Sequence, residues 1–168
     1  YLSDVDWSRT QAYAIGLSGI YINQRGRESQ GIVAAGDEKH RLVSELCEKL
    51  TGLRDLTRDE EAVHEAVSRE AVYSGPYVDA APDLIIGYNV GYRVSWDSAV
   101  GKTGDHVFLD NTKAWSGDHC MHPDLVPGVL FSNWKLNEGD ANILDMAPTT
   151  LDLLGLQKPE YMEGRSLV

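Results

Sequence analysis

The sequence predicts an α/β protein, and three observations support that prediction. Two short β-prone runs flank a glycine-containing turn within residues 11–23, as in a hairpin. Apolar residues then recur at helical spacing from Leu42 to Leu53. A short apolar run bounded by proline and glycine follows at residues 84–88, as in a buried strand. Strands, helices and short loops therefore mix along the chain, which is the pattern of an α/β fold.

The first expected elements are the two hairpin strands and a charged loop at residues 24–31. Arg25 and Arg27 in that loop could meet an anion, but a solvated loop is the favoured interpretation. A helix should follow, with Asp37 as its N-cap and Gly52 marking its end. We expect this helix to lay its apolar face on a sheet.

The middle of the chain contains one undecided segment and two β-prone segments. Residues 62–68 alternate loosely, which does not distinguish an exposed strand from a short helix. Residues 84–88 are typical of a buried strand in a parallel sheet, and residues 92–96 form a second β-prone piece. Residues 97–118 show little periodicity, and a loop of that length usually lines or covers a site.

The last part of the chain predicts one strand, one helix and an extended tail. Residues 129–132 have the composition of a buried strand. The segment 145–155 predicts a short helix, with Pro148 in its first turn and Gly155 at the C′ position. The remaining residues after Gly155 should form an extended closing segment.

The composition limits which classes of partner the protein is expected to bind. A chain of 168 residues fits one domain over residues 1–168 and can bury a real core. The net charge of −11 and the absence of a Lys/Arg cluster argue against a nucleic acid polymer or an anionic membrane as partner. There is no run of 18 or more apolar residues, so the sequence predicts no membrane span in this chain. Composition leaves the oligomeric state open.

The two cysteines are far apart in the sequence. Cys47 falls on the apolar face of the predicted helix, where a buried free thiol is the favoured interpretation. A disulfide between Cys47 and Cys120 is the less favoured alternative.

The stretch from Trp115 to Asn133 is the richest in potential ligands. His119 and His122 are three residues apart and are flanked by Asp118 and Asp124. Imidazole and carboxylate groups are ligands for zinc, manganese or iron, although this spacing alone is weak support for a metal site. Three further histidines are expected to be structural rather than metal ligands: His40, His64 and His106.

Three segments carry a family resemblance, namely residues 5–23, residues 117–131 and residues 144–167. In this order they resemble the C-terminal part of the alkaline phosphatase superfamily, in particular its type I phosphodiesterase/nucleotide pyrophosphatase-like branch. The resemblance implies the C-terminal part of a three-layer α/β/α sandwich with a mixed or mostly parallel sheet and a hairpin near the N-terminus. It covers nearly the whole chain.

The resemblance also implies a metal-dependent phosphoric ester hydrolase with two divalent metals, zinc being favoured and manganese being the alternative. His119 is the residue that matches a metal-ligand position of the family, late in the chain and ahead of a core strand. Asp118, Cys120 and His122 are expected to be loop residues or to surround the ligand, and contact of the Cys120 thiol with the metal is the less favoured alternative. The substrate would be a small-molecule phosphate ester.

The nucleophile and an Asp-His ligand pair of the family are expected upstream of this chain, so the isolated chain is expected to be inactive. Two other functions stay open: a non-catalytic binding module on the same scaffold, and part of a metal-dependent phosphomutase of the same superfamily. Tyr92 and Trp96 could stack on a substrate, although core packing is favoured for both.

Overall fold

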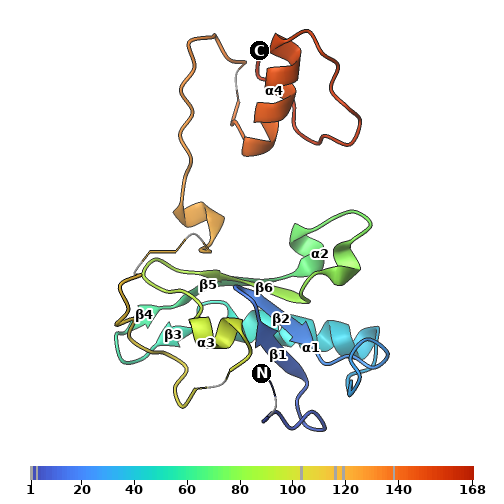
Figure 1. Ribbon diagram of the computed structural model, residues 1–168, viewed down its shortest axis with the longest axis vertical. Coiled ribbons are helices and arrows are strands. Elements are labelled where there is room, and N and C mark those ends of the chain that lie inside the picture. Colours follow the sequence, from blue (N-terminus) through green and yellow to red (C-terminus); the bar gives the residue numbers. More distant parts are fainter. Residues whose placement is uncertain (1, 3, 103, 116, 119, 138) are drawn as a thin grey trace. The chain divides into compact units, whose positions relative to one another are not determined.

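The computed structural model describes residues 2, 4–102, 104–115, 117–118, 120–137 and 139–168 (Figure 1). The chain divides into two compact units, residues 1–126 and residues 127–168. The single domain expected over residues 1–168 stays a prediction.

The first unit is built on a four-stranded sheet with the strand order β1-β2-β6-β5. Its strands are β1 (Ala12–Ile15), β2 (Gly19–Ile22), β5 (Val63–Ser68) and β6 (Leu84–Tyr88). β1 and β2 confirm the predicted hairpin, and β5 shows that the undecided segment 62–68 is a strand. The fold is therefore mixed α/β.

The strand directions differ from the expected mixed or mostly parallel sheet. Among the described strands of this sheet, each neighbouring pair is antiparallel: β1 with β2, β2 with β6, and β5 with β6. For β1 and β2 the reason is local, because a short turn can join only antiparallel neighbours. The α/β/α sandwich remains an expectation from the family resemblance.

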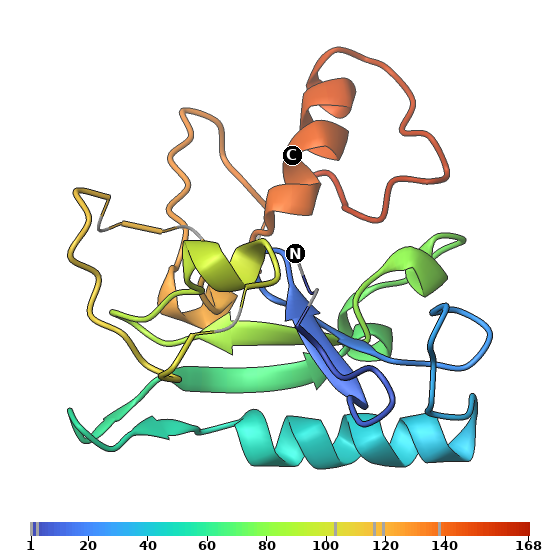
Figure 2. The same cartoon turned by 60° about the horizontal axis from the view of Figure 1, so that its bottom comes forward.

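Helix α1 (Asp37–Leu50) lies along one face of this sheet, as Figure 2 shows. Val43 of α1 packs with Ile22 and Leu84 in the centre of the sheet. A second cluster joins Val63, Ala66 and Ile86 of the sheet to residues at and just beyond the C-terminal end of α1. The predicted amphipathic helix and its packing are confirmed.

The C-terminal end of α1 is where the sequence predicts it, but the N-cap residue differs from the predicted one. Gly52 follows the helix with φ at 72°, a conformation that favours glycine, and confirms the predicted stop. At the other end, Gly36 rather than Asp37 is the N-cap residue, and no side chain caps the helix there. Asp37 is instead the first helical residue, where its charge still complements the helix dipole.

Short elements complete the first unit. They are β3 (Arg54–Asp55), β4 (Glu60–Glu61), α2 (Arg69–Val72), η1 (Val78–Ala80), α3 (Trp96–Ala99) and η2 (Pro123–Leu125). The β-prone piece at residues 92–96 is not a strand, because Ser95 caps the turn that begins at Trp96 by accepting a bond from the Ser98 amide at 3.0 Å. No helix in the described part of the chain has the length and apolar character to cross a membrane.

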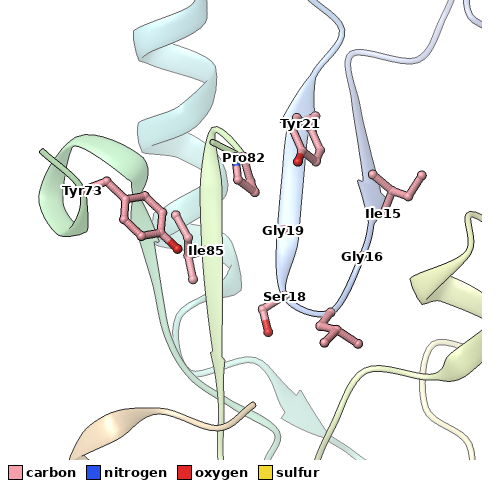
Figure 3. Close-up of a pocket in the computed structure, with 9 residues that line it drawn as sticks. Ile15, Gly16, Ser18, Gly19, Tyr21, Tyr73, Pro82 and Ile85 are labelled. Atoms are coloured by element: carbon pink, nitrogen blue, oxygen red, sulfur yellow. The ribbon is translucent and has the colours of Figure 1, made fainter. Parts of the chain in front are cut away.

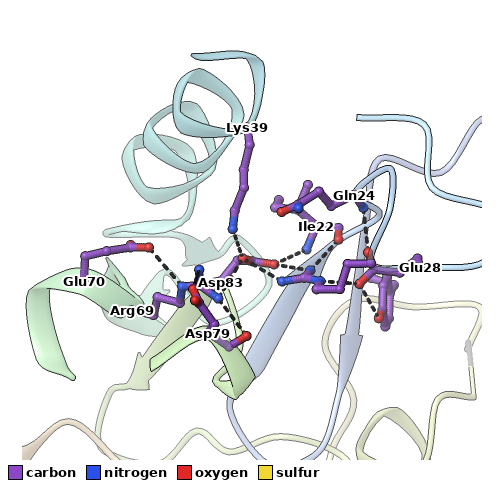
Figure 4. A network of polar contacts seen from close by, with 10 residues as sticks. Ile22, Gln24, Glu28, Lys39, Arg69, Glu70, Asp79 and Asp83 are labelled. Atoms are coloured by element: carbon purple, nitrogen blue, oxygen red, sulfur yellow. Dashed lines mark hydrogen bonds and ion pairs between the residues drawn. The ribbon is translucent and has the colours of Figure 1, made fainter. Parts of the chain in front are cut away.

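A buried carboxylate, Asp83, ties the hairpin, α1 and α2 together (Figure 4). Its oxygens lie 2.6 Å from Arg27 Nη2, 2.6 Å from Lys39 Nζ and 3.7 Å from Arg69 Nη1. It also accepts a hydrogen bond from the Ile22 amide at 2.7 Å. The loop at residues 24–31 is largely exposed, as predicted, but the Arg27 guanidinium reaches a buried partner that is distant in sequence.

The second unit consists of η3 (Ile143–Asp145), α4 (Met146–Leu153) and a returning tail. Pro148 lies in the first turn of α4, and Gly155 follows the helix with φ at 69°, as predicted. The tail runs back to the start of this helix, where Asp145 Oδ1 accepts a hydrogen bond from the Arg165 amide at 2.9 Å. The predicted helix and extended closing segment are confirmed.

The predicted strand at residues 129–132 is not formed. Val129 and Phe131 are 85% and 90% exposed, and no described residue pairs with this segment in a ladder. An apolar run becomes a strand only when a neighbouring strand satisfies its backbone groups and covers its side chains. Composition alone therefore overestimated the order of this segment.

Candidate metal-binding loop

The predicted ligand His119 lies outside the described residues, so its role as a metal ligand stays a prediction. Both of its neighbours in sequence are described. Asp118 and Cys120 belong to a loop that the rest of the first unit anchors on each side of residue 119. The positions of those anchors show how the loop is held.

The upstream anchor is an ion pair between Arg93 and Asp118. Arg93 Nε lies 3.1 Å from Asp118 Oδ2, and both side chains are only 15% exposed. The other oxygen of Asp118 accepts a hydrogen bond from the Cys120 amide at 2.9 Å. Asp118 therefore bridges Arg93 and the loop backbone, and its expected place around a metal ligand stays a prediction.

Both cysteines are free, as favoured from the sequence, and Cys47 is partly rather than fully buried. Burial, together with the nearby charge of Asp118, raises the pKa of the Cys120 thiol. A raised pKa favours the neutral thiol in the absence of a metal ion. The expected place of Cys120 beside the ligand stays a prediction.

The downstream anchor joins the loop to the end of β6. Met121 forms a parallel bridge with Tyr88, and the His122 amide donates a hydrogen bond to the Tyr88 carbonyl oxygen at 3.1 Å. The ring of His122 lies directly on Gly87, where a Cβ atom would come within 2.5 Å of His122 Cδ2. A glycine at position 87 is what allows this close approach.

An irregularity in β5 brings two polar side chains to the same place. Val63 pairs with Tyr88 and Glu65 pairs with Gly87, so His64 is an extra residue in the ladder, as in a β-bulge. Val63 and Ala66 point into the core cluster beneath the sheet. The extra residue therefore lets His64 and Glu65, although adjacent in sequence, both approach the loop above Gly87.

The histidine rings of His64 and His122 meet with centroids 4.5 Å apart and planes at 52°. His122 Nε2 lies 3.0 Å from Glu65 Oε2, and His122 Nδ1 lies 3.9 Å from Asp124 Oδ2. One potential ligand atom from each of His64, His122 and Asp124 falls within 4.8 Å of the others. Imidazole and carboxylate groups are among the donors that transition-metal ions take in proteins.

Sequence reasoning missed this set, because it expected His64 to be structural and His122 to be a loop or surrounding residue. The two histidines are far apart in sequence, and the strand irregularity that exposes His64 has no proline or glycine to mark it. Gly87 within a β-prone run was the available signal, because an isolated glycine in a strand often marks a close approach.

Tyr92 is half-buried and Trp96 is exposed, and neither belongs to the two core clusters. The Tyr92 hydroxyl bonds to Asp55 and Glu60, at 3.2 Å each, and burial followed by these bonds raises its pKa to about 12. Trp96 is 51% exposed and carries the Arg93 guanidinium 4.9 Å above its ring. The core packing favoured for both is therefore wrong, and substrate stacking stays a prediction.

A hollow of about 260 Å³ lies between the β1–β2 turn and the start of β6 (Figure 3). Pro82, Ile85 and Tyr73 line one side of it, and the hairpin lines the other. Its lining contains no carboxylate, histidine or cationic side chain. It therefore lacks the groups that would hold a metal or a phosphate.

Comparison with known proteins gives two partial similarities. The 2,3-bisphosphoglycerate-independent phosphoglycerate mutase of Clostridium acetobutylicum is 38% identical over 95 residues, which are 51% of this chain and 18% of that enzyme. The enzyme of the same name from Acholeplasma laidlawii is 42% identical over 67 residues, which are 38% of this chain and 13% of that enzyme. The chain thus matches less than a fifth of either relative's length. No family model matches the chain. No solved structure matches it either.

Proposed function

We propose that this chain is part of a metal-dependent phosphoryl-transfer enzyme of the alkaline phosphatase superfamily, with the chemistry of a phosphomutase. The observation that carries the proposal is the similarity to two phosphoglycerate mutases. Neither relative is a phosphodiesterase or a nucleotide pyrophosphatase. The mutase alternative is therefore better supported than the hydrolase first expected from the resemblance.

The charge of the chain agrees with a role for metal ions. A protein with a net charge of −11 repels a phosphate ester unless a cation offsets the charge at the site. Two divalent ions would do so, and they would also stabilise the attacking and leaving oxygens in the transition state. His119 is the proposed ligand from this chain.

The anchors around residue 119 support that role. Arg93 holds Asp118 before it, and the end of β6 holds Met121 and His122 after it. A metal ligand needs neighbours that fix its position, because small displacements weaken coordination. These contacts supply such support on both sides.

The substrate is proposed to be a small phosphate ester that also carries a hydroxyl group. A mutase returns the phosphoryl group to such a hydroxyl, whereas a hydrolase passes it to water. The two functions therefore differ in whether inorganic phosphate accumulates.

The test uses the full-length protein, stripped of metal and then supplied with Mn²⁺ or Zn²⁺, with 3-phosphoglycerate followed by ³¹P NMR. We expect a second phosphate ester to appear without inorganic phosphate, and only after metal is added. The variant His119→Ala should lower the rate by on the order of 100-fold or more, because it removes a ligand of a catalytic metal. His106→Ala, an exposed histidine of the same loop region, is the matched control.

Two results would overturn the proposal. Release of inorganic phosphate from 3-phosphoglycerate, or cleavage of bis-p-nitrophenyl phosphate in its place, would favour the hydrolase. Equal rates for the His119→Ala and His106→Ala proteins would remove His119 from the site.

A further inference from the structure

The group formed by His64, His122 and Asp124 has the features of a metal site in its own right. Two imidazoles and one carboxylate converge on the sheet face above Gly87, with one ligand atom from each inside a 4.8 Å span. We propose that these three residues bind one divalent transition-metal ion of the zinc type. Glu65 is proposed as the carboxylate that orients His122.

The hydrogen bonds of His122 leave the correct nitrogen for a metal. Glu65 Oε2 can only accept, so His122 Nε2, 3.0 Å away, carries the proton that it donates. The lone pair is then on Nδ1, on the side of Asp124. A carboxylate that bonds to the far nitrogen of a ligating histidine is the usual support of a metal site, because it fixes the tautomer and the ring orientation.

The Nδ1 lone pair currently accepts a long hydrogen bond from the Asp124 amide, at 3.3 Å. A metal ion would take that lone pair in exchange for this weak contact. Asp124 Oδ2, 3.9 Å from Nδ1, would then be a neighbouring ligand. Loss of this weak hydrogen bond costs little free energy compared with the free energy gained from the metal–ligand bonds.

The spacing is close to what one ion requires. Tetrahedral zinc with bonds of roughly 2.0–2.2 Å places its ligand atoms about 3.3–3.6 Å apart. The present span of 4.8 Å must shorten by about 1 Å on metal binding, which side-chain rotation can achieve. Asp124 can supply it, because its side chain is 80% exposed. Water would complete the coordination, since three protein ligands leave a fourth position open.

The carboxylates around the rings of His64 and His122 favour a bound cation. Glu61 Oε1 lies 3.9 Å from His64 Nδ1, so a carboxylate approaches each histidine from outside the proposed ligand set. Without an ion, the carboxylates of Glu61, Glu65 and Asp124 repel one another around the two rings. A divalent ion would convert that proximity into strong electrostatic attraction.

This inference does not use His119 and goes beyond the proposed mutase activity. Its test is therefore carried out in a background that already lacks His119, and it measures metal binding rather than turnover. The probe is Co²⁺, which replaces zinc at such sites and shows visible absorption when bound by histidine and carboxylate ligands.

Metal-free full-length protein carrying His119→Ala is titrated with Co²⁺, with and without a second substitution. We expect an absorption band that Zn²⁺ displaces and that falls by one bound Co²⁺ equivalent in His64→Asn, His122→Asn and Asp124→Asn. His106→Asn should keep the band and is the matched control. Glu65→Gln should weaken Co²⁺ binding by roughly 10- to 100-fold, as loss of an orienting carboxylate does.

Asp124→Asn is the decisive variant, because its exposed side chain can be changed without disturbing the core, and circular dichroism should confirm its fold. A band that forms equally in the Asp124→Asn and His106→Asn proteins would overturn the proposal. So would the absence of any Zn²⁺-displaceable band in the His119→Ala background. Either result would leave the mutase test unaffected, since that test depends on product and on His119.

Discussion

At the scale of single residues, Asp83 is a carboxylate at 1% exposure surrounded by three cationic side chains. Burial alone would raise the pKa of Asp83, but hydrogen bonds from Arg27, Lys39 and the Ile22 amide outweigh it and leave the pKa lowered. Its removal would leave buried or partly buried positive charges without their common partner. Such a loss costs more than the loss of a surface ion pair.

Asp83→Asn is therefore expected to lower the free energy of unfolding by about 3–5 kcal/mol, as measured by urea denaturation. Asp79→Asn is the matched control, because Asp79 also pairs with Arg69, at 2.8 Å, yet its side chain is 97% exposed. The Asp79→Asn substitution should lower the free energy of unfolding by less than about 1 kcal/mol. Equal losses in the two variants would show that the buried network is not the source of the stability.

At the scale of elements, the second unit depends on the return of its tail to α4. Leu167 is buried, and its amide donates a hydrogen bond to Thr149 Oγ1 at 3.0 Å. Gly164 makes this path possible, because a Cβ atom there would lie 2.0 Å from the Leu144 carbonyl oxygen. The backbone must separate if any side chain is added.

Gly164→Ala should thus loosen the tail and destabilise the second unit by about 1–3 kcal/mol, the usual cost of overpacking. Hydrogen exchange should show faster exchange at the Leu167 amide. Gly128→Ala is the control, because a Cβ atom at Gly128 meets nothing within 4 Å. Unchanged protection at Leu167 in the Gly164→Ala protein would contradict the proposed packing.

Elements with strong local signals were predictable from the sequence. The hairpin, α1 and α4 each carry their turn or end signals within a few residues, so periodicity and glycine positions were sufficient. Strand pairing was less accessible, because the antiparallel β5–β6 register depends on residues about twenty positions apart. The prediction of a strand at residues 129–132 failed for the same reason, because apolar composition does not show whether a neighbouring strand is available to pair with it.

The candidate site was predictable only in part. The sequence marked the loop around His119 and His122, but not the approach of His64. That approach depends on one irregular residue in β5 and on the fit of the His122 ring over Gly87. Both are properties of the folded sheet, so spacing along the chain could not show them.

At the scale of the whole molecule, acid sensitivity should follow from Asp83. Its pKa is lowered in the folded state, so its contribution to stability is fully present above the unfolded-state pKa of about 3.9. That contribution is lost as the pH falls through the lowered folded-state pKa. The difference in unfolding free energy between the wild type and Asp83→Asn should therefore be largest near neutral pH.

Denaturation curves for both proteins between pH 7 and the acid limit of the fold would measure this. The two stabilities should converge only below about pH 4, where protonation makes the wild-type side chain resemble asparagine. A constant difference down to the lowest pH would contradict the assigned direction of the pKa shift.

The extra residue in β5 affects how this surface can change during evolution. Val63 faces the core, Glu65 faces away and Ala66 faces the core, so the strand would alternate regularly without His64. Deletion of one codon would remove an imidazole from the surface and leave every core side chain in its place. In evolutionary terms, one such deletion or insertion is enough to remove or create the histidine pair.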